Sequence, residues 1–323
     1  MKRANRSLPK TYIVFFSLIA AFCPLILGRA EDIHATLERA EELAKGGKTE
    51  ESTRLYRQVL KSDPQCWQAY VGIGRNHFAA GEYADAAAAF QKALEFQPSD
   101  PKLLNWLGRS YLQQHHPEKI SELLSRANST ITNSALAHLL LARAYDAQDK
   151  VDEAKHEIDR ALTIDPRCHG AHFAHGFIDW STGELLNAER ELRQELSLDP
   201  HESLAAYYLA EVLEKHGKLQ EAECVLTEMG RDVPNTYLYH LGLGKLYERK
   251  KNNLLAAEHY RQAIRLDSQQ PEAHYRLAVT LRALRETAQA NEEFQVFSQL
   301  GSHITRGMGQ GMGRMRPHLP DFD

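Results

Sequence analysis

The stretch Trp67–Asp100 reads WQAYVGIGRNHFAAGEYADAAAAFQKALEFQPSD, and its spacing of apolar and small residues decides the fold. Tyr70, Ile73 and Gly74 follow one another at i, i+3 and i+4, as residues on one face of an α-helix do. A second helical stripe follows a glycine, and Pro98 stops it because proline cannot continue a helix. The stretch therefore predicts two amphipathic helices joined by a short turn.

The same pattern returns every 34 residues along most of the chain. Prolines recur at multiples of this period, and so does a series of small residues that would let two helix backbones approach closely. Because one helical hairpin cannot bury its own apolar faces, the units must stack on one another. The small series is Ala40, Gly74, Gly108, Ala142, Gly176, Ala210, Gly244 and Ala278, and the prolines are Pro64, Pro98, Pro166, Pro200 and Pro234.

The residue types at these places resemble the tetratricopeptide repeat family. Leu107, Gly108 and Tyr111 carry the resemblance in one unit, and equivalent residues recur in the next. The resemblance implies an all-α fold, an α-solenoid of about eight helix–turn–helix units that forms a right-handed superhelix. It covers residues 31–304, with units that begin at Ile33, Trp67, Pro101, Ala135, His169, Ser203, Tyr237 and Pro271.

The fourth place of each unit departs from the family pattern. Where the family carries tryptophan, four units of this chain carry histidine. Because histidine returns at the same place, the sequence predicts a repeated structural role for it rather than a metal site. The four residues are His138, His172, His240 and His274.

One side of the first helices would line a concave groove, which in tetratricopeptide arrays usually binds a protein or peptide segment. Arg75, Arg109 and Arg143 stand at the ninth place of three successive units, and such a row suits an acidic segment because arginine donates paired hydrogen bonds to carboxylates. Alternatively, these arginines pair with neighbouring acids. Further candidates form an apolar patch that either holds an anchor side chain or supports packing between repeats. They are Phe173, Phe177, Trp180, Tyr207, Leu241 and Tyr275.

Residues 1–30 predict export. Residues 1–10 contain basic residues and no acidic residue. An uncharged apolar run over residues 11–28 follows, and small residues lie at its end, up to Ala30. The pattern is typical of a secretory signal peptide cleaved near Ala30, and the alternative is a membrane anchor formed by residues 11–28. We therefore expect the repeats outside the cytoplasm, periplasmic or secreted after cleavage and membrane-anchored without it.

Composition and motifs exclude several functions. The chain has 323 residues and a formal net charge of −4, which argues against nucleic-acid binding because phosphate contacts need an excess of Lys and Arg. Its few cysteines are expected to be free thiols. Phosphate-binding loops, nucleophile elbows and zinc-protease motifs are missing, so no enzyme activity and no cofactor are predicted. The sequence thus favours a non-catalytic scaffold that binds a partner segment.

The last stretch, residues 305–323, lies beyond the repeats and is rich in Gly and Met, which predicts a disordered tail. Its thioether and imidazole groups would suit Cu(I), so metal handling is one alternative function. A second alternative is self-assembly in envelope assembly or export, with Phe297 of the last unit contacting another copy. The oligomeric state and the partner stay open. The residues for copper are Met308, Met312, Met315 and His318.

Overall fold

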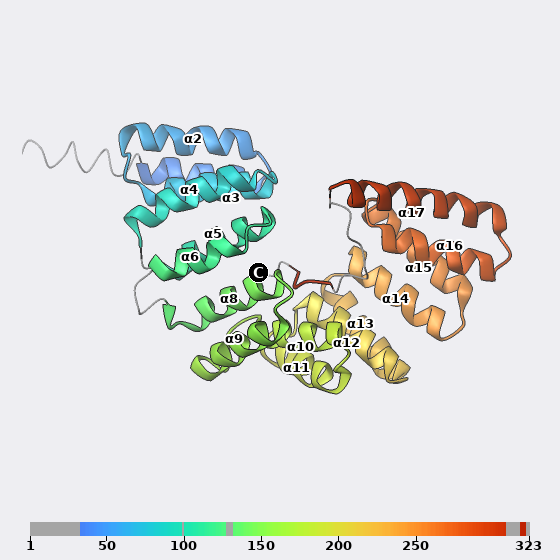
Figure 1. Ribbon diagram of the computed structural model, residues 1–323. Coiled ribbons are helices and arrows are strands. Elements are labelled where there is room, and N and C mark those ends of the chain that lie inside the picture. Colours follow the sequence, from blue (N-terminus) through green and yellow to red (C-terminus); the bar gives the residue numbers. More distant parts are fainter. Residues whose placement is uncertain (1–32, 99, 127–131, 308–316, 321–323) are drawn as a thin grey trace, which may run out of the picture. The chain divides into compact units, whose positions relative to one another are not determined.

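The computed structural model describes residues 33–98, 100–126, 132–307 and 317–320, and every regular element in them is an α-helix (Figure 1). The helices fall into two compact units, which divide between residues 132 and 133. The first unit holds a helix over residues 33–45 and then α2 (Thr49–Ser62), α3 (Trp67–Ala79), α4 (Tyr83–Phe96), α5 (Pro101–Gln113) and α6 (Glu118–Arg126).

The second unit contains five helix pairs, each with the hairpin arrangement that the 34-residue period predicts. Consecutive helices of a pair pack against each other along their length, and the all-α repeat fold is confirmed. The helices are α8 (Ala135–Asp146), α9 (Val151–Ile164), α10 (Ala171–Thr182), α11 (Leu185–Leu198), α12 (Ser203–Lys215), α13 (Leu219–Asp232), α14 (Tyr237–Arg249), α15 (Asn253–Leu266), α16 (Pro271–Ala283) and α17 (Thr287–Gly307).

Small residues of the periodic series allow the two helices of a pair to approach. A Cβ atom added to Gly74 of α3 would lie 2.6 Å from the ring of Phe90 in α4. The same relation holds 170 residues later, where a Cβ on Gly244 would lie 2.4 Å from the ring of Tyr260. Both rings are fully buried. The small residue and the large one sixteen places later therefore form a matched pair that sets the distance between the helices.

The turn inside each hairpin contains one residue with a left-handed backbone. Gly81 has a φ of 77°, and Asp149, two periods further on, has a φ of 57°. Because only glycine takes this conformation without steric cost, the units with other residues at this place carry local strain. The left-handed residue therefore occurs at a fixed position of the repeat, whether or not that residue is glycine.

Each of the four recurring histidines contacts a residue of the same hairpin, which is a glutamate for three of them and His259, at 3.1 Å, for His240. His138 Nδ1 lies 2.5 Å from Glu157 Oε2, and His274 Nδ1 lies 2.6 Å from Glu293 Oε2. His172 pairs with a glutamate in the same way, at 2.7 Å. Each contact joins the first helix of a unit to the second, nineteen residues later. The contacts therefore brace the hairpins from within.

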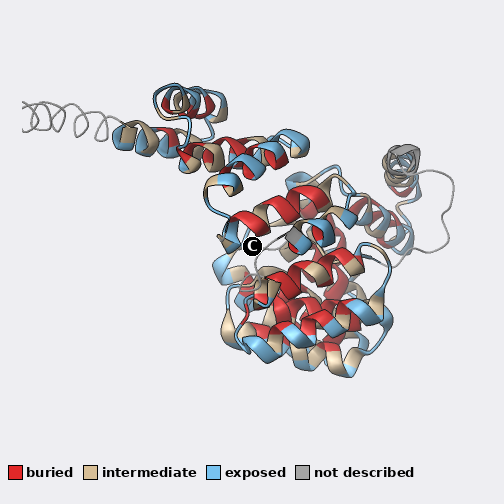
Figure 2. Cartoon of the chain, turned by 60° about the vertical axis from the view of Figure 1, so that its left-hand side comes forward, coloured by how far each residue is buried: buried red, intermediate tan, exposed pale blue. Residues whose placement is uncertain are grey.

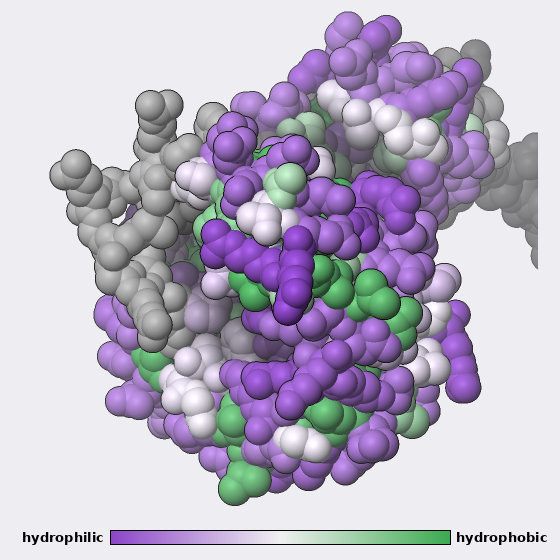
Figure 3. Space-filling view, turned by 90° about the vertical axis from the view of Figure 1, so that its right-hand side faces the viewer, coloured by the Kyte–Doolittle hydropathy of each residue, from purple (hydrophilic) through white to green (hydrophobic). Residues whose placement is uncertain are grey.

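Figure 2 shows the buried residues on the helix faces that turn toward neighbouring helices of the same unit. The face drawn in Figure 3 is mostly hydrophilic, with apolar side chains scattered between polar ones. Large apolar residues on the described surface are few, and Leu186 is 79% exposed and Leu254 70% exposed. No helix of the described residues is both long enough and apolar enough to cross a membrane. The predicted leader or anchor, residues 1–30, lies outside the described residues.

The predicted tail, residues 305–323, is described only in part, so its disorder stays a prediction. The backbone of α17 runs to Gly307, and residues 317–320 lie against the second unit, where Leu319 contacts its apolar core. Burial of apolar surface by the Leu319 side chain favours this placement. Met308, Met312 and Met315 lie outside the described residues.

Candidate binding groove

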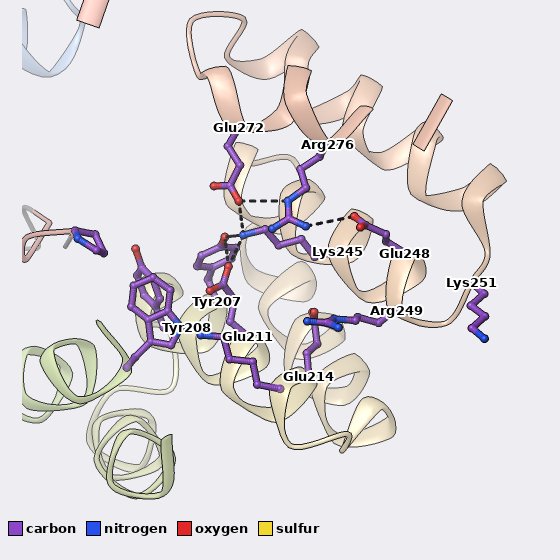
Figure 4. A pocket seen from close by; sticks show the side chains of 13 residues that line it. Tyr207, Tyr208, Glu211, Glu214, Lys245, Glu248, Arg249, Lys251, Glu272 and Arg276 are labelled. Carbon is purple, nitrogen blue, oxygen red and sulfur yellow. Dashed lines mark hydrogen bonds and ion pairs between the residues drawn. The ribbon is translucent and has the colours of Figure 1, made fainter. Parts of the chain in front are cut away.

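A cavity of about 760 Å³ lies in the second unit among the first helices of four successive pairs (Figure 4). We call it the inner groove. Its wall combines two tyrosines and a tryptophan with charged side chains of both signs. The lining residues come from α10, α12, α14, α16 and two neighbouring segments, and they are Trp180, Tyr207, Tyr208, Glu211, Glu214, Lys215, Lys245, Glu248, Arg249, Lys251, Glu272, Arg276 and Pro317.

Lys245 is the central charge of the groove, and it is only 8% exposed. Its Nζ lies 2.6 Å from Glu272 Oε1 and 2.6 Å from the hydroxyl of Tyr207, and it also pairs with Glu211 (Figure 4). Tyr207 in turn donates a hydrogen bond of 2.7 Å to Glu211. One ammonium group therefore joins α12, α14 and α16, which belong to three successive repeats.

Burial opposes ionisation of Glu211, yet the ammonium of Lys245 outweighs it and lowers the pKa of this carboxyl below its usual value. Arg276 adds a second bridge between repeats, because its guanidinium lies 3.5 Å from Glu248 and 3.7 Å from Glu272. These ion pairs occupy one wall of the groove. They hold the repeats together there and leave fewer of its charges for a ligand.

Two polar atoms of the groove have no hydrogen-bond partner within the described part of the chain. They are Nε1 of Trp180, a donor, and Oε1 of Glu214, an acceptor, and both atoms are buried. Such atoms are rare in folded proteins, since leaving one unpaired costs about 1–3 kcal/mol. A ligand that offers both an acceptor and a donor would remove this cost.

Burial raises the pKa of Glu214 to about 7, with a further contribution from the charge of Glu211. In the unfolded chain the carboxyl loses its proton near its usual pKa of 4.5. Between these two pH values the folded chain keeps a proton that the unfolded chain has lost, so Glu214 makes the fold progressively less stable as the pH rises, and the loss is complete above about 7.

We therefore expect Glu214→Gln to raise the free energy of unfolding by about 2 kcal/mol at about pH 8 and to change it little near pH 4.5. Urea unfolding followed by circular dichroism at the two pH values measures the difference. Glu50→Gln, at a side chain that is 90% exposed, is the matched control and should have no effect at either pH. An equal effect of Glu214→Gln at both pH values would contradict the prediction.

The predicted aromatic anchors divide into buried and lining residues. Phe173 is fully buried and Phe177 is 1% exposed, which agrees with the packing alternative for these two rings. They lie behind the wall, where the ring of Phe177 stands 5.5 Å from that of Trp180 and 5.0 Å from that of Tyr208. Trp180 and Tyr208 face the cavity, with ring centroids 4.8 Å apart. Packing against the core thus orients the two rings that a ligand can reach.

The other predicted groove residues also differ in exposure. Tyr207 lines the cavity while almost fully buried, and Leu241 is 1% exposed and belongs to the core around α14 and α16. Tyr275 is 44% exposed and contacts Phe297 at a ring distance of 5.3 Å. Tyr208 and Glu214 also line the cavity, but the sequence did not predict them as groove residues. Their places in the repeat carried no pattern that distinguished them from solvated positions.

The three predicted arginines are not equivalent. Arg75 and Arg109 belong to the first unit and Arg143 to the second. Arg109 is 8% exposed, and its guanidinium lies over the ring of Trp106 at 4.6 Å, whereas the exposed Arg75 lies 5.8 Å from the same ring. Arg143 is 6% exposed. Stacking on Trp106, which sequence reasoning missed, therefore accounts for the burial of Arg109, and binding of a carboxylate by the row stays a prediction.

Possible metal ligands gather at two surface places in the described residues. Ligand atoms of each group lie within 4.8 Å of one another, and in the first group His77 already pairs with Glu82 at 2.5 Å. His318 of the predicted copper set lies near two carboxylates, 3.7 Å from Asp146 and 3.9 Å from Asp149. Cys66, Cys168 and Cys224 are free thiols, as predicted.

The fold defines a helical-repeat protein, and a family model identifies the repeat. A model described as tetratricopeptide repeat matches residues 37–101, 72–118, 173–228, 226–271 and 241–297, and a second model of that description matches residues 135–168. The chain belongs to the tetratricopeptide repeat family. Proteins of this family generally act as scaffolds that bind other proteins, and they are typically non-catalytic.

Individual relatives are distant. Anaphase-promoting complex subunit 3 of Schizosaccharomyces pombe is 23% identical over 223 residues, which are 69% of this chain and 34% of that protein. The type IV pilus assembly protein PilF of Pseudomonas aeruginosa is 25% identical over 178 residues, which are 54% of this chain and 71% of that protein. The chain thus spans about a third of the first relative.

A solved structure shows the same fold. The anaphase-promoting complex hetero-tetramer Cut9–Hcn1 superposes with a TM-score of 0.62 at 16% identity, over 83% of this chain and 53% of that one. At this identity the likeness concerns the fold alone. The partner and the ligand of this chain must be inferred from its own groove.

Proposed function

We propose that this protein is a non-catalytic scaffold outside the cytoplasm, and that its inner groove binds an extended segment of a protein partner. The observation that carries the proposal is the pair of unpartnered atoms in the groove, Trp180 Nε1 and Glu214 Oε1. A peptide backbone in extended conformation offers carbonyl oxygens and N–H groups along its length, and it would supply a partner to each atom.

The aromatic wall would add binding energy to these hydrogen bonds. Trp180 and Tyr208 present their rings to the cavity, and buried aromatic anchors carry much of the energy of protein interfaces. The ammonium of Lys215 lies 5.1 Å from the centre of the Trp180 ring. An acidic group of a partner that binds beside this ring would pair with that ammonium. The ion pairs of Lys245 keep the opposite wall rigid, so binding would cost little ordering of the groove.

The test uses peptides selected from a random library displayed on phage, with the full chain as the target. Peptides that bind the inner groove are expected to bind Trp180→Phe about five-fold more weakly, because that variant keeps a ring but loses the N–H donor. Fluorescence anisotropy with the synthetic peptide measures the dissociation constants. Trp106→Phe, a matched change in the first unit, should leave them unchanged.

Two results would contradict the proposal. One is that no library peptide binds either the full chain or its Leu319→Asp variant, in which the aspartate is not expected to pack against the apolar core. The other is that every selected peptide binds the Trp180→Phe and Trp106→Phe variants equally well, which would place binding elsewhere. Circular dichroism of both variants ensures that a lost interaction does not reflect a lost fold.

The location outside the cytoplasm rests on residues 1–30. A positively charged start, an apolar run and small residues near Ala30 support export. Determination of the first residue of the protein recovered from the cells that produce it distinguishes the cleaved form from a chain anchored by residues 11–28. A full-length chain recovered from the cytosol would contradict this part of the proposal.

The two alternative functions stay predictions. Copper handling depends on methionines outside the described residues, and His318 has carboxylate neighbours. Self-assembly through the last unit involves Phe297, which packs against Tyr275 within the same chain. Neither alternative draws support from a described contact, so the groove carries the proposed function.

A further inference from the structure

Residues 317–320, with the sequence Pro-His-Leu-Pro, lie against the second unit beside α8 (Figure 1). We call them the inner segment. The backbone N–H of Leu319 donates a hydrogen bond of 2.6 Å to Oδ2 of Asp146, at the end of α8 and 173 residues earlier in the chain. The Leu319 side chain packs against the apolar core of the second unit, and Pro317 lines the inner groove.

The partner of the Leu319 N–H is a carboxylate inside the protein. The Asp146 side chain is 1% exposed, and burying a carboxylate is costly unless it receives hydrogen bonds or an opposite charge. The inner segment supplies one such hydrogen bond, and Nδ1 of His318 stands 3.7 Å from the same oxygen. A charge-assisted hydrogen bond of this type is stronger than one between neutral groups.

The contacts of the inner segment are those by which grooves recognise peptides. A buried side chain accepts a hydrogen bond from one backbone group, one apolar side chain packs against the core, and prolines lie on both sides of it and restrict the backbone. Pro317 shares the cavity wall with Trp180 and Tyr208, the rings assigned above to partner binding. The inner segment and an extended partner would therefore compete for adjoining parts of one surface.

We propose that residues 317–320 are an internal ligand of the inner groove, and that a partner binds by displacing them with an extended segment that carries leucine next to proline. The inference rests on the proposed function of the groove and adds the chemistry of the partner and a means of regulation. Because the segment belongs to the same chain, its effective concentration is high, on the order of millimolar for a short tether. A free segment of similar intrinsic affinity binds the intact chain weakly.

The experiment uses the full chain, its Leu319→Asp variant and a fluorescein-labelled peptide with the sequence of residues 314–323, RMRPHLPDFD. An aspartate cannot replace leucine against an apolar core, so the variant releases the inner segment. Fluorescence anisotropy is expected to show that the peptide binds Leu319→Asp at least about ten-fold more tightly than it binds the unchanged chain. A peptide with the same Leu-to-Asp change should bind neither form.

A matched control is Leu186→Asp, which changes a leucine that is 79% exposed and should bind the peptide as weakly as the unchanged chain does. Equal binding of the peptide to the unchanged chain and to Leu319→Asp overturns the inference, and so does no binding to either. Sedimentation of the unchanged chain and of Leu319→Asp tests a further outcome. If the unchanged chain is a dimer and the variant is a monomer, the segment occupies the groove of a second copy. That result also overturns the proposal of an internal ligand.

The library peptides separate this inference from the proposed function. If they bind the groove in a Trp180-dependent manner but equally well in the unchanged chain and in Leu319→Asp, the groove binds partners and the internal ligand is wrong. If they bind neither chain while the peptide of residues 314–323 binds Leu319→Asp, the groove accepts its own segment and the proposed binding of partners fails.

Discussion

Replacing Lys245 with methionine is expected to lower the free energy of unfolding by about 3 kcal/mol, because it leaves a buried carboxylate without its counter-ion. Lys245 is 8% exposed and pairs with Glu211 and Glu272. The side chain of Glu211 is 11% exposed, so water replaces the lost ammonium only in part, whereas that of Glu272 is 45% exposed and stays hydrated. The loss therefore comes mainly from Glu211.

Urea unfolding at neutral pH, followed by circular dichroism, measures this loss. The matched control is Lys218→Met, which removes a lysine that is 42% exposed and lies 2.9 Å from Glu189. Glu189 keeps contacts to Arg193 and His216, and exposed ion pairs contribute less than about 1 kcal/mol, so the control should unfold almost as the unchanged chain does. Equal stabilities of the two variants would show that the Lys245 network does not join the repeats.

The second large effect is expected at the close approach of α3 and α4. Gly74→Val should destabilise the first unit by about 3 kcal/mol, because even a Cβ atom would lie 2.6 Å from the fully buried ring of Phe90. Gly301→Val is the control, since a Cβ at that helical position meets no atom within 4 Å. Valine has a slightly better helix propensity than glycine, so the control should not lose stability.

A double-mutant cycle isolates the contact between the two helices. In a chain that carries Phe90→Ala, the ring is gone and Gly74→Val finds space, so its additional cost should be much smaller than in the unchanged chain. An additive result would mean that the close approach of glycine and phenylalanine does not set the helix distance. Urea unfolding of the four chains provides the comparison.

Much of the fold follows from local chemistry that repeats every 34 residues. Gly74 and Gly244 were visible as members of one periodic series of small residues, because each helix pair has the same packing problem and solves it with residues of the same size. The histidines of the fourth place were also visible. Three of them have a glutamate partner nineteen residues later, whereas His240 has His259 at that place, and none of these partners was predicted from the sequence.

The candidate groove was predicted less completely, because periodicity says which side of a helix is used but not how deeply a residue is buried. Phe173 and Phe177 stand at places that would line the groove, yet neighbouring rings cover them, and Trp180 and Tyr208 present the accessible surface instead. Arg109 stands in a predicted row of cations but is stacked on Trp106. Such outcomes depend on the sizes of neighbours that are far away in the sequence.

The sequence by itself determined the helices, their boundaries near proline and glycine, and the small-to-large contacts within each hairpin, since all of these depend on residues less than one repeat apart. Only the tertiary structure decided which charges meet across repeats, as Lys245 does with Glu211 and Glu272, and where residues 317–320 lie. The physical reason is the same in both cases. Contacts between stacked repeats, and contacts of a segment outside the period, form only after the helices have packed and excluded water, and no local pattern encodes that packing.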